Sequence, residues 1–219
     1  QVIRLESAGG PVDDIVLPLF GEHMAHNAAL AVAAVEAFLG GKPLSPEVIV
    51  EGLASVVAPA RLEVIHRGPT VVLDTCHNPH GARATIDGVT EAFDFDPLIG
   101  VTAMMADKDV EGVLEIFAEK MSSLVCTSVA TTSRALTPEA LAARAVDFFG
   151  AENVHVASTM AEAIDKAVGL ADEVGAGAGV LIAGSVIAAG EARALLVHEG
   201  ARAADETEDA WLVALEDQV

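Results

Sequence analysis

Short apolar runs alternate with amphipathic stretches from about residue 59 onward. Residues 62–66 and 70–74 are two β-rich runs, and Arg67-Gly68-Pro69 between them predicts a tight hairpin turn. Beyond this hairpin, single strands and helices follow one another, which predicts right-handed βαβ units. We therefore expect an α/β fold with a Rossmann-like, mainly parallel sheet of about six strands, one of them antiparallel, and helices on both faces. The other four strands are predicted at residues 98–102, 123–127, 153–157 and 179–183.

The predicted helices carry local start signals. Thr137-Pro138-Glu139 combines an N-cap residue, a proline at the first helical position and an acid in the first turn. Thr159 and Glu162 have the spacing of a capping box. These signals place helix starts between the predicted strands, as the alternating pattern requires.

The first part of the chain has a different pattern. Residues 1–20 are short apolar pieces broken by turn residues, which indicates a β-hairpin or two edge strands. Residues 22–39 are rich in alanine with apolar positions all round, so we expect a helix packed on most of its surface. A second helix is predicted from Ser45-Pro46-Glu47 to about residue 56. The change of pattern predicts a unit at residues 1–58, a second at 59–200 and an acidic tail at 201–219.

Charge and composition narrow the class of protein. The formal charge of −21 excludes the basic surface that nucleic-acid binding needs. The sequence has no run of 18 apolar residues and only two cysteines, so we expect no membrane partner, no disulfide framework and a cytoplasmic location. The chain begins at Gln1 within a predicted strand, from which we expect a preceding part of a longer protein. A monomer is the simplest expectation.

Polar side chains gather where the predicted strand at residues 70–74 ends. Asp74, His77 and Asn78 lie there, and Pro79 opens a helix. The carboxyl ends of parallel strands share one edge of a sheet, where open α/β sheets bind ligands. Asp74 either accepts a hydrogen bond from a ribose hydroxyl or a metal-bound water, or only caps the helix. His77 suits carboxylate binding or proton transfer, and Asn78 is best explained as the N-cap.

The same edge would collect further candidates. Gly184-Ser185 follows a predicted strand and opens a helix, so its N–H groups and hydroxyl could hold a carboxylate or phosphate. The alternative is that Ser185 is an N-cap and nothing more. The loops after the other strands bring residues 107–109, residues 131–134 and Ser158 to this edge.

Two other kinds of site find little support in the sequence. The chain has no HExxH element or second cysteine pair, so no dedicated metal site is expected. Four histidines and one cysteine are residue types that bind metals, but they do not change this expectation. They are His23, His26, Cys76, His77 and His80. Gly175, Gly177 and Gly179 precede their predicted strand instead of following it, which disfavours a Rossmann oxidoreductase. No GxxxxGK[ST] phosphate-binding loop occurs.

Six elements, in the same order, resemble the C-terminal portion of folylpolyglutamate synthases, which are often bifunctional as dihydrofolate synthases, within the Mur ligase superfamily. The resemblance implies that residues 1–58 are a remnant of the central ATP-binding domain and that a Rossmann-like ligase domain follows. The six elements are Gly21-Glu22-His23 with Asn27-Ala28-Ala29, Pro59-Ala60-Arg61-Leu62-Glu63, Leu73-Asp74-Thr75-Cys76-His77-Asn78-Pro79, Asp107-Lys108-Asp109-Val110, Ser133-Arg134-Ala135-Leu136, and Gly184-Ser185 with Gly190-Glu191-Ala192-Arg193.

The resemblance implies ATP-dependent amide ligation. ATP would phosphorylate a carboxylate of the pterin substrate or of its glutamate tail, and the amine of L-glutamate would attack the acyl phosphate. The implied small-molecule partners are ATP, L-glutamate and folate or dihydropteroate, with Mg²⁺ held by residues upstream, so this chain alone would be inactive. The implied contacts are Asn27 to the adenine, Arg61 to the phosphates, Asp74 to the ribose, and His77 and Ser185 to glutamate. His77 is also the catalytic candidate, and Lys108 and Arg134 stand at the site edge.

Two alternatives stay open. Another Mur-type ligase would join an amino acid to a peptidoglycan precursor, and a panel of substrates would separate it. A non-catalytic domain would bind a nucleotide or amino acid for regulation, and a phosphate-binding loop upstream in the same frame would exclude it.

Overall fold

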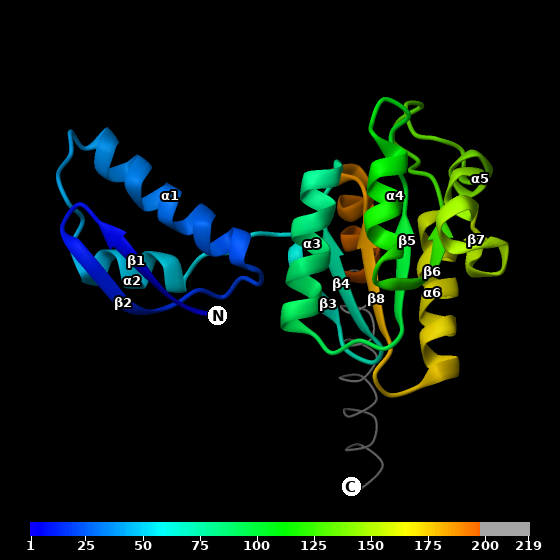
Figure 1. Ribbon diagram of the computed structural model, residues 1–219, viewed down its shortest axis with the longest axis horizontal. Coiled ribbons are helices and arrows are strands. Elements are labelled where there is room, and N and C mark those ends of the chain that lie inside the picture. The colour runs from blue at the N-terminus through cyan, green and yellow to red at the C-terminus, as the bar shows by residue number, and fades with distance from the viewer. Residues whose placement is uncertain (198–219) are drawn as a thin grey trace, which may run out of the picture.

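A six-stranded sheet forms the larger lobe of the computed structural model, which describes residues 1–197 (Figure 1). The strand order is β3-β4-β8-β5-β6-β7, and all neighbours are parallel except the antiparallel pair β3 and β4. The predicted sheet is confirmed, and strand ends shift by one or two residues at most. The strands are β3 (Arg61–His66), β4 (Thr70–Asp74), β5 (Leu98–Thr102), β6 (Met121–Cys126), β7 (Val154–Val156) and β8 (Gly179–Ala183).

Helices cover both faces of this sheet, as predicted. One face packs against α3 (Pro79–Ala92), α4 (Val110–Ala118) and α5 (Pro138–Phe149). The other packs against α6 (Met160–Val174) and a helix at residues 186–197. Successive strand residues serve opposite faces, because side chains alternate along a strand: Val72 joins the first cluster, and Val71 and Leu73 join the second. A sheet buried on both sides explains why its strands are apolar throughout.

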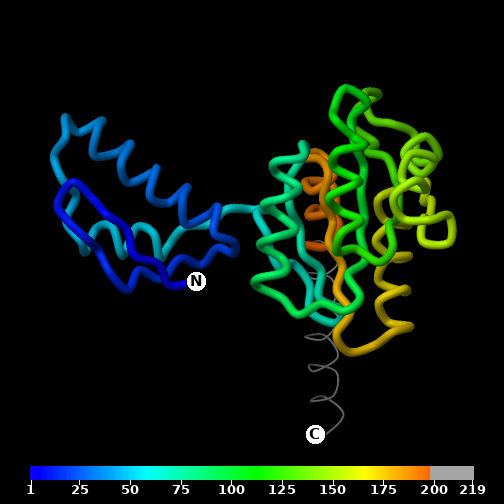
Figure 2. Tube along the Cα trace, in the orientation of Figure 1, coloured from blue at the N-terminus to red at the C-terminus, as the bar shows by residue number. Residues whose placement is uncertain are grey.

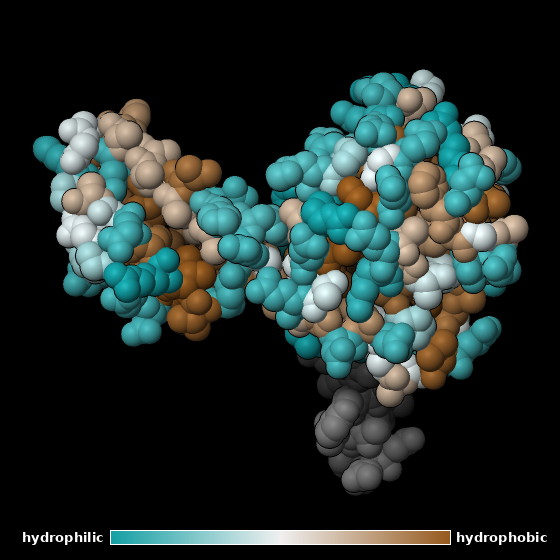
Figure 3. All heavy atoms as spheres, viewed as in Figure 1, coloured by the Kyte–Doolittle hydropathy of each residue, from teal (hydrophilic) through white to brown (hydrophobic). Residues whose placement is uncertain are grey.

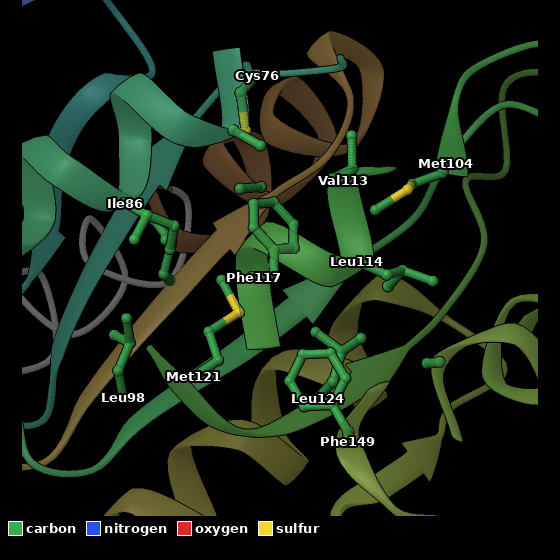
Figure 4. Close-up of a cluster of buried hydrophobic side chains, with 14 of the residues drawn as sticks. Cys76, Ile86, Leu98, Met104, Val113, Leu114, Phe117, Met121, Leu124 and Phe149 are labelled. Atoms are coloured by element: carbon green, nitrogen blue, oxygen red, sulfur yellow. The ribbon is translucent and has the colours of Figure 1, made fainter. Parts of the chain in front are cut away.

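The core under α3, α4 and α5 is centred on α4. Phe117 of α4 is fully buried, and Figure 4 shows its ring amid side chains from several elements. Ile86 reaches this cluster from α3, Phe149 from α5 and Leu124 from β6. A single apolar cluster therefore fixes these three helices on the sheet.

The predicted helix caps form. The Thr137 hydroxyl accepts a 3.2 Å hydrogen bond from the Ala140 N–H at the start of α5. The Thr159 hydroxyl accepts one of 3.2 Å from the Glu162 N–H at the start of α6. The Glu162 carboxylate in turn accepts a 3.0 Å hydrogen bond from the Ser158 N–H, one residue before the cap. This is a variant of the capping box, in which the acid usually bonds to the N–H of the cap residue itself.

The smaller lobe contains the first four elements. The strands β1 (Val2–Ser7) and β2 (Gly10–Val16) form an antiparallel hairpin, and α1 (Glu22–Phe38) and α2 (Pro46–Ala54) pack on it. Its core is separate from the two cores of the large sheet. Figure 2 shows the chain leaving α2 and crossing to the larger lobe in one extended segment. The acidic tail predicted at residues 201–219 lies outside the described residues.

The expectation that α1 is packed on most of its surface is wrong. Its buried residues are Met24, Ala28, Val32 and Glu36, which recur every fourth position and so form one stripe. Large apolar residues outside this stripe face outward: Leu30 is 67% exposed and Phe38 is 90% exposed. Figure 3 shows such apolar surface on this lobe. Among the described residues no helix is both long and apolar enough to cross a membrane.

Candidate functional site

A pocket of about 160 Å³ lies where β3, β4 and the start of α3 meet. It brings together three of the predicted site residues, namely Arg61, Asp74 and His77. His23 reaches the pocket from α1 of the smaller lobe, so both lobes contribute to it. The remaining lining residues are Cys76, Asn78, His80, Gly81, Ala84 and Thr85.

Asp74 ends β4 with its carboxylate almost fully buried, at 2% exposure. Its Oδ1 accepts hydrogen bonds of 2.8 Å from the Cys76 N–H and 2.8 Å from the Thr85 hydroxyl. Its Oδ2 accepts one of 3.1 Å from the Leu62 N–H. The alternative that Asp74 only caps α3 is wrong, because the cap of α3 is Asn78. Oδ1 of Asn78 accepts a 2.8 Å hydrogen bond from the Gly81 N–H. Asp74 instead connects β3, the β4–α3 loop and α3.

Arg61 stands on a strained segment of backbone. Its neighbours Ala60 and Leu62 have φ angles of 52° and 47°, a left-handed conformation that residues other than glycine rarely adopt. The register of β3 against β4 shifts between Arg61 and Glu63, as in a β-bulge, and bulges re-aim side chains beside active sites. Such strain persists only where the surroundings enforce it.

Two carboxylates hold that segment from either side of Arg61. Glu63 Oε2 accepts a 2.7 Å hydrogen bond from the Ala60 N–H, and Asp74 Oδ2 accepts the bond from Leu62. The Arg61 side chain is exposed and forms no ion pair with any of residues 1–197. Its forked donors are therefore available to a phosphate or carboxylate.

Histidines surround the rest of the pocket. Nδ1 of His77 lies 3.3 Å from the Thr75 carbonyl oxygen, which accepts, so Nε2 of the neutral ring keeps a lone pair. Burial lowers the pKa of His23, Asp74 opposes this, and the charges of Arg61 and His80 lower the pKa further. The pocket thus combines the Arg61 guanidinium and three histidine rings with the buried Asp74 carboxylate, and Arg61 is the group among them that suits an anion.

Ser185 lies close to this pocket but does not line it. Its side chain is buried, and its hydroxyl accepts a 3.2 Å hydrogen bond from the Ile187 N–H, so it caps the helix at residues 186–197. Gly184 before it has a φ of 109°, and a Cβ there would lie 2.3 Å from the Thr102 hydroxyl oxygen. Burial raises the pKa of the neighbouring Cys76 thiol to about 12, and that thiol lies beside the Gly184 backbone.

The other predicted residues lie apart from the pocket. Asn27 is exposed on α1, and its Nδ2 is 3.9 Å from the Met24 sulfur. Arg134 forms a 2.8 Å ion pair with Asp107 after β5, and the hydrogen bond from Arg134 holds the pKa of that carboxyl below its usual range. Lys108 is exposed in the same loop. The structure therefore does not bring Asn27, Lys108 or Arg134 together with Arg61 and Asp74.

The sequence prediction missed several residues of this site. The sequence pattern indicates only a metal-binding role for His80, and His23 and Glu63 otherwise enter only through the family resemblance. The spacing of His80, three residues after His77 at the start of one helix, is a signal that the two rings share one end of that helix. Nothing local predicts that Thr85 donates to Asp74, because that contact depends on how α3 packs.

The described part of the chain contains no set of side chains that could bind a metal ion. Within residues 1–197 no three His, Cys, Asp or Glu side chains gather to hold a metal ion. Cys76 and Cys126 are buried free thiols. The described residues thus do not fit a Mg²⁺ site.

Known proteins are similar to this chain in sequence and in fold. Residues 60–186 match the family model for the Mur ligase, glutamate ligase domain. Dihydrofolate synthase/folylpolyglutamate synthase of Mycobacterium tuberculosis is 42% identical over 208 residues, which are 89% of this chain and 42% of that protein. The solved structure of Mycobacterium tuberculosis folylpolyglutamate synthase complexed with ADP superposes with a TM-score of 0.85 at 43% identity, covering 90% of this chain and 45% of that one.

A more distant solved structure has the same fold. E. coli FolC in complex with DHPP and ADP gives a TM-score of 0.71 at 27% identity, over 89% of this chain and 43% of that one. The chain therefore spans less than half the length of each of these relatives.

Proposed function

The chain belongs to the Mur ligase family through its glutamate ligase domain, and from this membership we propose that it is the C-terminal part of an ATP-dependent ligase. The ligase adds L-glutamate to folate or dihydropteroate through an acyl-phosphate intermediate. Its relative in Mycobacterium tuberculosis carries the name dihydrofolate synthase/folylpolyglutamate synthase. Because that relative is more than twice as long as the matched region, we expect this chain alone to be inactive.

The domain division follows from the same proposal. Residues 1–58 are the remnant of a central ATP-binding domain, residues 59–200 are the ligase domain, and residues 201–219 are an acidic tail. Support comes from the separate cores of the two lobes and from the single crossing of the chain between them.

The observation that carries the proposal is that Arg61 lines the pocket with an unpaired guanidinium among the described residues. Its guanidinium has no ion partner within residues 1–197, lines the pocket, and stands on a segment held by Glu63 and Asp74. We assign Arg61 to the phosphates of ATP, where two parallel N–H donors stabilise charge that builds during phosphoryl transfer. ADP in the Mycobacterium tuberculosis structures supports ATP as the nucleotide.

Other nucleotide contacts belong to this proposal. Oδ2 of Asp74 has one protein donor and keeps a lone pair, which it can offer to a ribose hydroxyl. Asn27, exposed on α1, is assigned to the adenine. Mg²⁺ is expected from the part of the ligase outside this chain.

Glutamate is assigned to His77 and Ser185. In the ligation step the glutamate amine attacks the acyl carbon, the bond from that carbon to the phosphate oxygen breaks, and inorganic phosphate leaves. The amine loses a proton in the process. Nε2 of His77 has a lone pair to accept that proton, and the N-terminus of the helix capped by Ser185 suits a glutamate carboxylate.

Local positive charge matters because the whole chain carries −21. That charge repels anionic substrates at long range, so basic groups at the site must attract them. On this ground Lys108 and Arg134 stay candidates for the edge of the site, although both lie apart from the pocket and Arg134 is already paired with Asp107. The proposed ligase acts on small-molecule partners in the cytoplasm, with neither nucleic acid nor membrane as a partner, and a monomer is its simplest arrangement.

The test measures ATP-dependent addition of L-glutamate to dihydropteroate and to reduced folate by the complete ligase. Arg61→Ala should lower kcat/KM for ATP by roughly 100-fold. Arg144→Ala is the matched control, since Arg144 forms a 3.1 Å ion pair with Glu111 on α5 and α4 and lines no part of the pocket. Unchanged kinetics in Arg61→Ala would overturn the assignment.

A panel of acceptors separates the alternatives. Activity only with a peptidoglycan precursor would identify another Mur-type ligase. Nucleotide binding without turnover on any acceptor would identify a regulatory domain.

A further inference from the structure

A pair of charged side chains joins the helix at residues 186–197 to β3. Nε of Arg193 lies 2.9 Å from Oε2 of Glu63, and Nη2 lies 3.0 Å from Oε1. The guanidinium thus makes a two-pronged contact with a residue 130 positions earlier. The Glu63 side chain is only 22% exposed. Such paired hydrogen bonds fix orientation as well as distance.

Glu63 passes this constraint to the segment that carries Arg61. Its Oε2 also accepts the 2.7 Å hydrogen bond from the Ala60 N–H. Burial raises the pKa of Glu63, but the hydrogen bonds from Arg193 and Ala60 and the charge of Arg193 outweigh it, so the pKa lies below its usual value. The carboxylate therefore stays charged and accepts from both partners.

The strained backbone makes this support consequential. Ala60 and Leu62 both hold positive φ, a strained conformation that persists only where the surroundings enforce it. Asp74 secures the Leu62 side of Arg61. Only Glu63 secures the Ala60 side among the side chains of residues 1–197.

We propose that Arg193 and Glu63 are positioning residues that hold Arg61 in its phosphate-binding place. The proposal rests on the proposed function, in which Arg61 binds ATP. The helix that carries Arg193 is capped by Ser185, assigned above to glutamate, and eight residues of helix set the two about 12 Å apart. One rigid element therefore supports Arg61 and carries the assigned glutamate contact.

The alternative is that the ion pair only stabilises the fold. Partly exposed ion pairs contribute little to stability. A stability role would lower the melting temperature and leave the kinetic constants of the folded enzyme alone. A positioning role would raise KM for ATP more than it changes the melting temperature.

The experiment measures KM for ATP, KM for glutamate, kcat and melting temperature in the complete ligase. Arg193→Ala should raise KM for ATP about tenfold, as loss of a positioned charge contact would. Arg193→Lys keeps the charge without the fork and should recover part of that loss. Glu63→Gln keeps an acceptor for Ala60 and should be intermediate. Arg144→Ala serves as control, because Arg144 is as exposed as Arg193, 39% in each case.

A double-mutant cycle decides the matter. If Arg193 acts through Arg61, then adding Arg193→Ala to Arg61→Ala should leave KM for ATP where Arg61→Ala alone set it. Additive increases, or a parental KM for ATP in Arg193→Ala, would overturn the proposal. An Arg61→Ala enzyme with parental KM for ATP would overturn the proposed function instead.

Discussion

The Leu62 N–H donates a 3.1 Å hydrogen bond to Oδ2 of Asp74, and this bond joins the start of β3 to the end of β4 within the core. The same carboxylate holds the β4–α3 loop through Cys76 and α3 through Thr85. One buried charge therefore organises the three elements that form the pocket. Its neutralisation should be costly.

Asp74→Asn should lower the free energy of unfolding by about 1–3 kcal/mol, the range for leaving a buried hydrogen-bond donor unsatisfied. An amide keeps the shape but turns one acceptor into a donor that would face an N–H. Urea unfolding followed by circular dichroism measures this change. Asp107→Asn, at an exposed ion pair, should change the free energy of unfolding far less. Equal effects at the two positions would contradict the structural role of Asp74.

Gly184→Ala should destabilise the protein and disturb Ser185. The new Cβ would lie 2.3 Å from the Thr102 hydroxyl oxygen, on a residue with a φ of 109°. The expected loss is about 1–3 kcal/mol, as for overpacking elsewhere. Gly190→Ala is the matched control: Gly190 lies within the helix that follows Gly184 and has open space around a built Cβ, so the change should stabilise by about 0.5–1 kcal/mol. In thermal unfolding, the melting temperature should fall in Gly184→Ala and rise in Gly190→Ala.

Phe117→Ala should cost about 3–5 kcal/mol, because it empties the centre of the cluster shared by α3, α4 and α5. Phe38→Ala offers the same chemical change at a side chain that is 90% exposed. That control should change stability by less than about 0.5 kcal/mol. Urea titration of both variants compares the two positions, and a large loss in Phe38→Ala would mean that the exposed face of α1 is covered in solution.

Glu63 predicts a stability change at acid pH. Its pKa in the folded protein lies below the ordinary value of 4.5, so the unfolded chain binds more protons as the pH falls below 4.5. Its contribution is therefore present above pH 4.5 and is lost as the pH falls through the folded value. Glu63→Gln should flatten the dependence of unfolding free energy on pH in that window. An unchanged slope below pH 4.5 would count against the charged contact with Arg193.

His23 predicts a change nearer neutrality. Burial is the main cause of its lowered pKa, and the charges of Arg61 and His80 add to it while Asp74 opposes it. The folded protein then binds the proton less readily than the unfolded chain, so stability should fall as the pH drops below 6.5. His23→Gln should remove part of that fall. His155, whose pKa burial and Lys166 also lower, should contribute with the same sign, and the double variant should flatten the slope further.

The sheet and its helices were predictable because their signals are local. Caps such as Thr137 and Thr159 act within one turn, and apolar runs bounded by polar residues mark buried strands. The exposed side of α1 was not predictable, since an alanine-rich helix does not show which of its faces has a partner. Contacts such as Arg193 with Glu63, or Thr85 with Asp74, depend on tertiary packing and have no signal in the neighbouring sequence.

The reversed direction of β3 determines what the pocket contains. Because β3 runs against β4, its first residue, Arg61, pairs with the last residue of β4, Asp74. In a parallel orientation, the strand's rise of about 3.3 Å per residue would carry Arg61 some 15–20 Å away, to the opposite edge of the sheet. Arg61 would then be absent from the edge where five parallel strands end. The hairpin turn at Arg67-Gly68-Pro69 reverses the chain and so places Arg61 among the loops of the carboxyl edge. The turn itself lies at the other end of the two strands, far from the pocket.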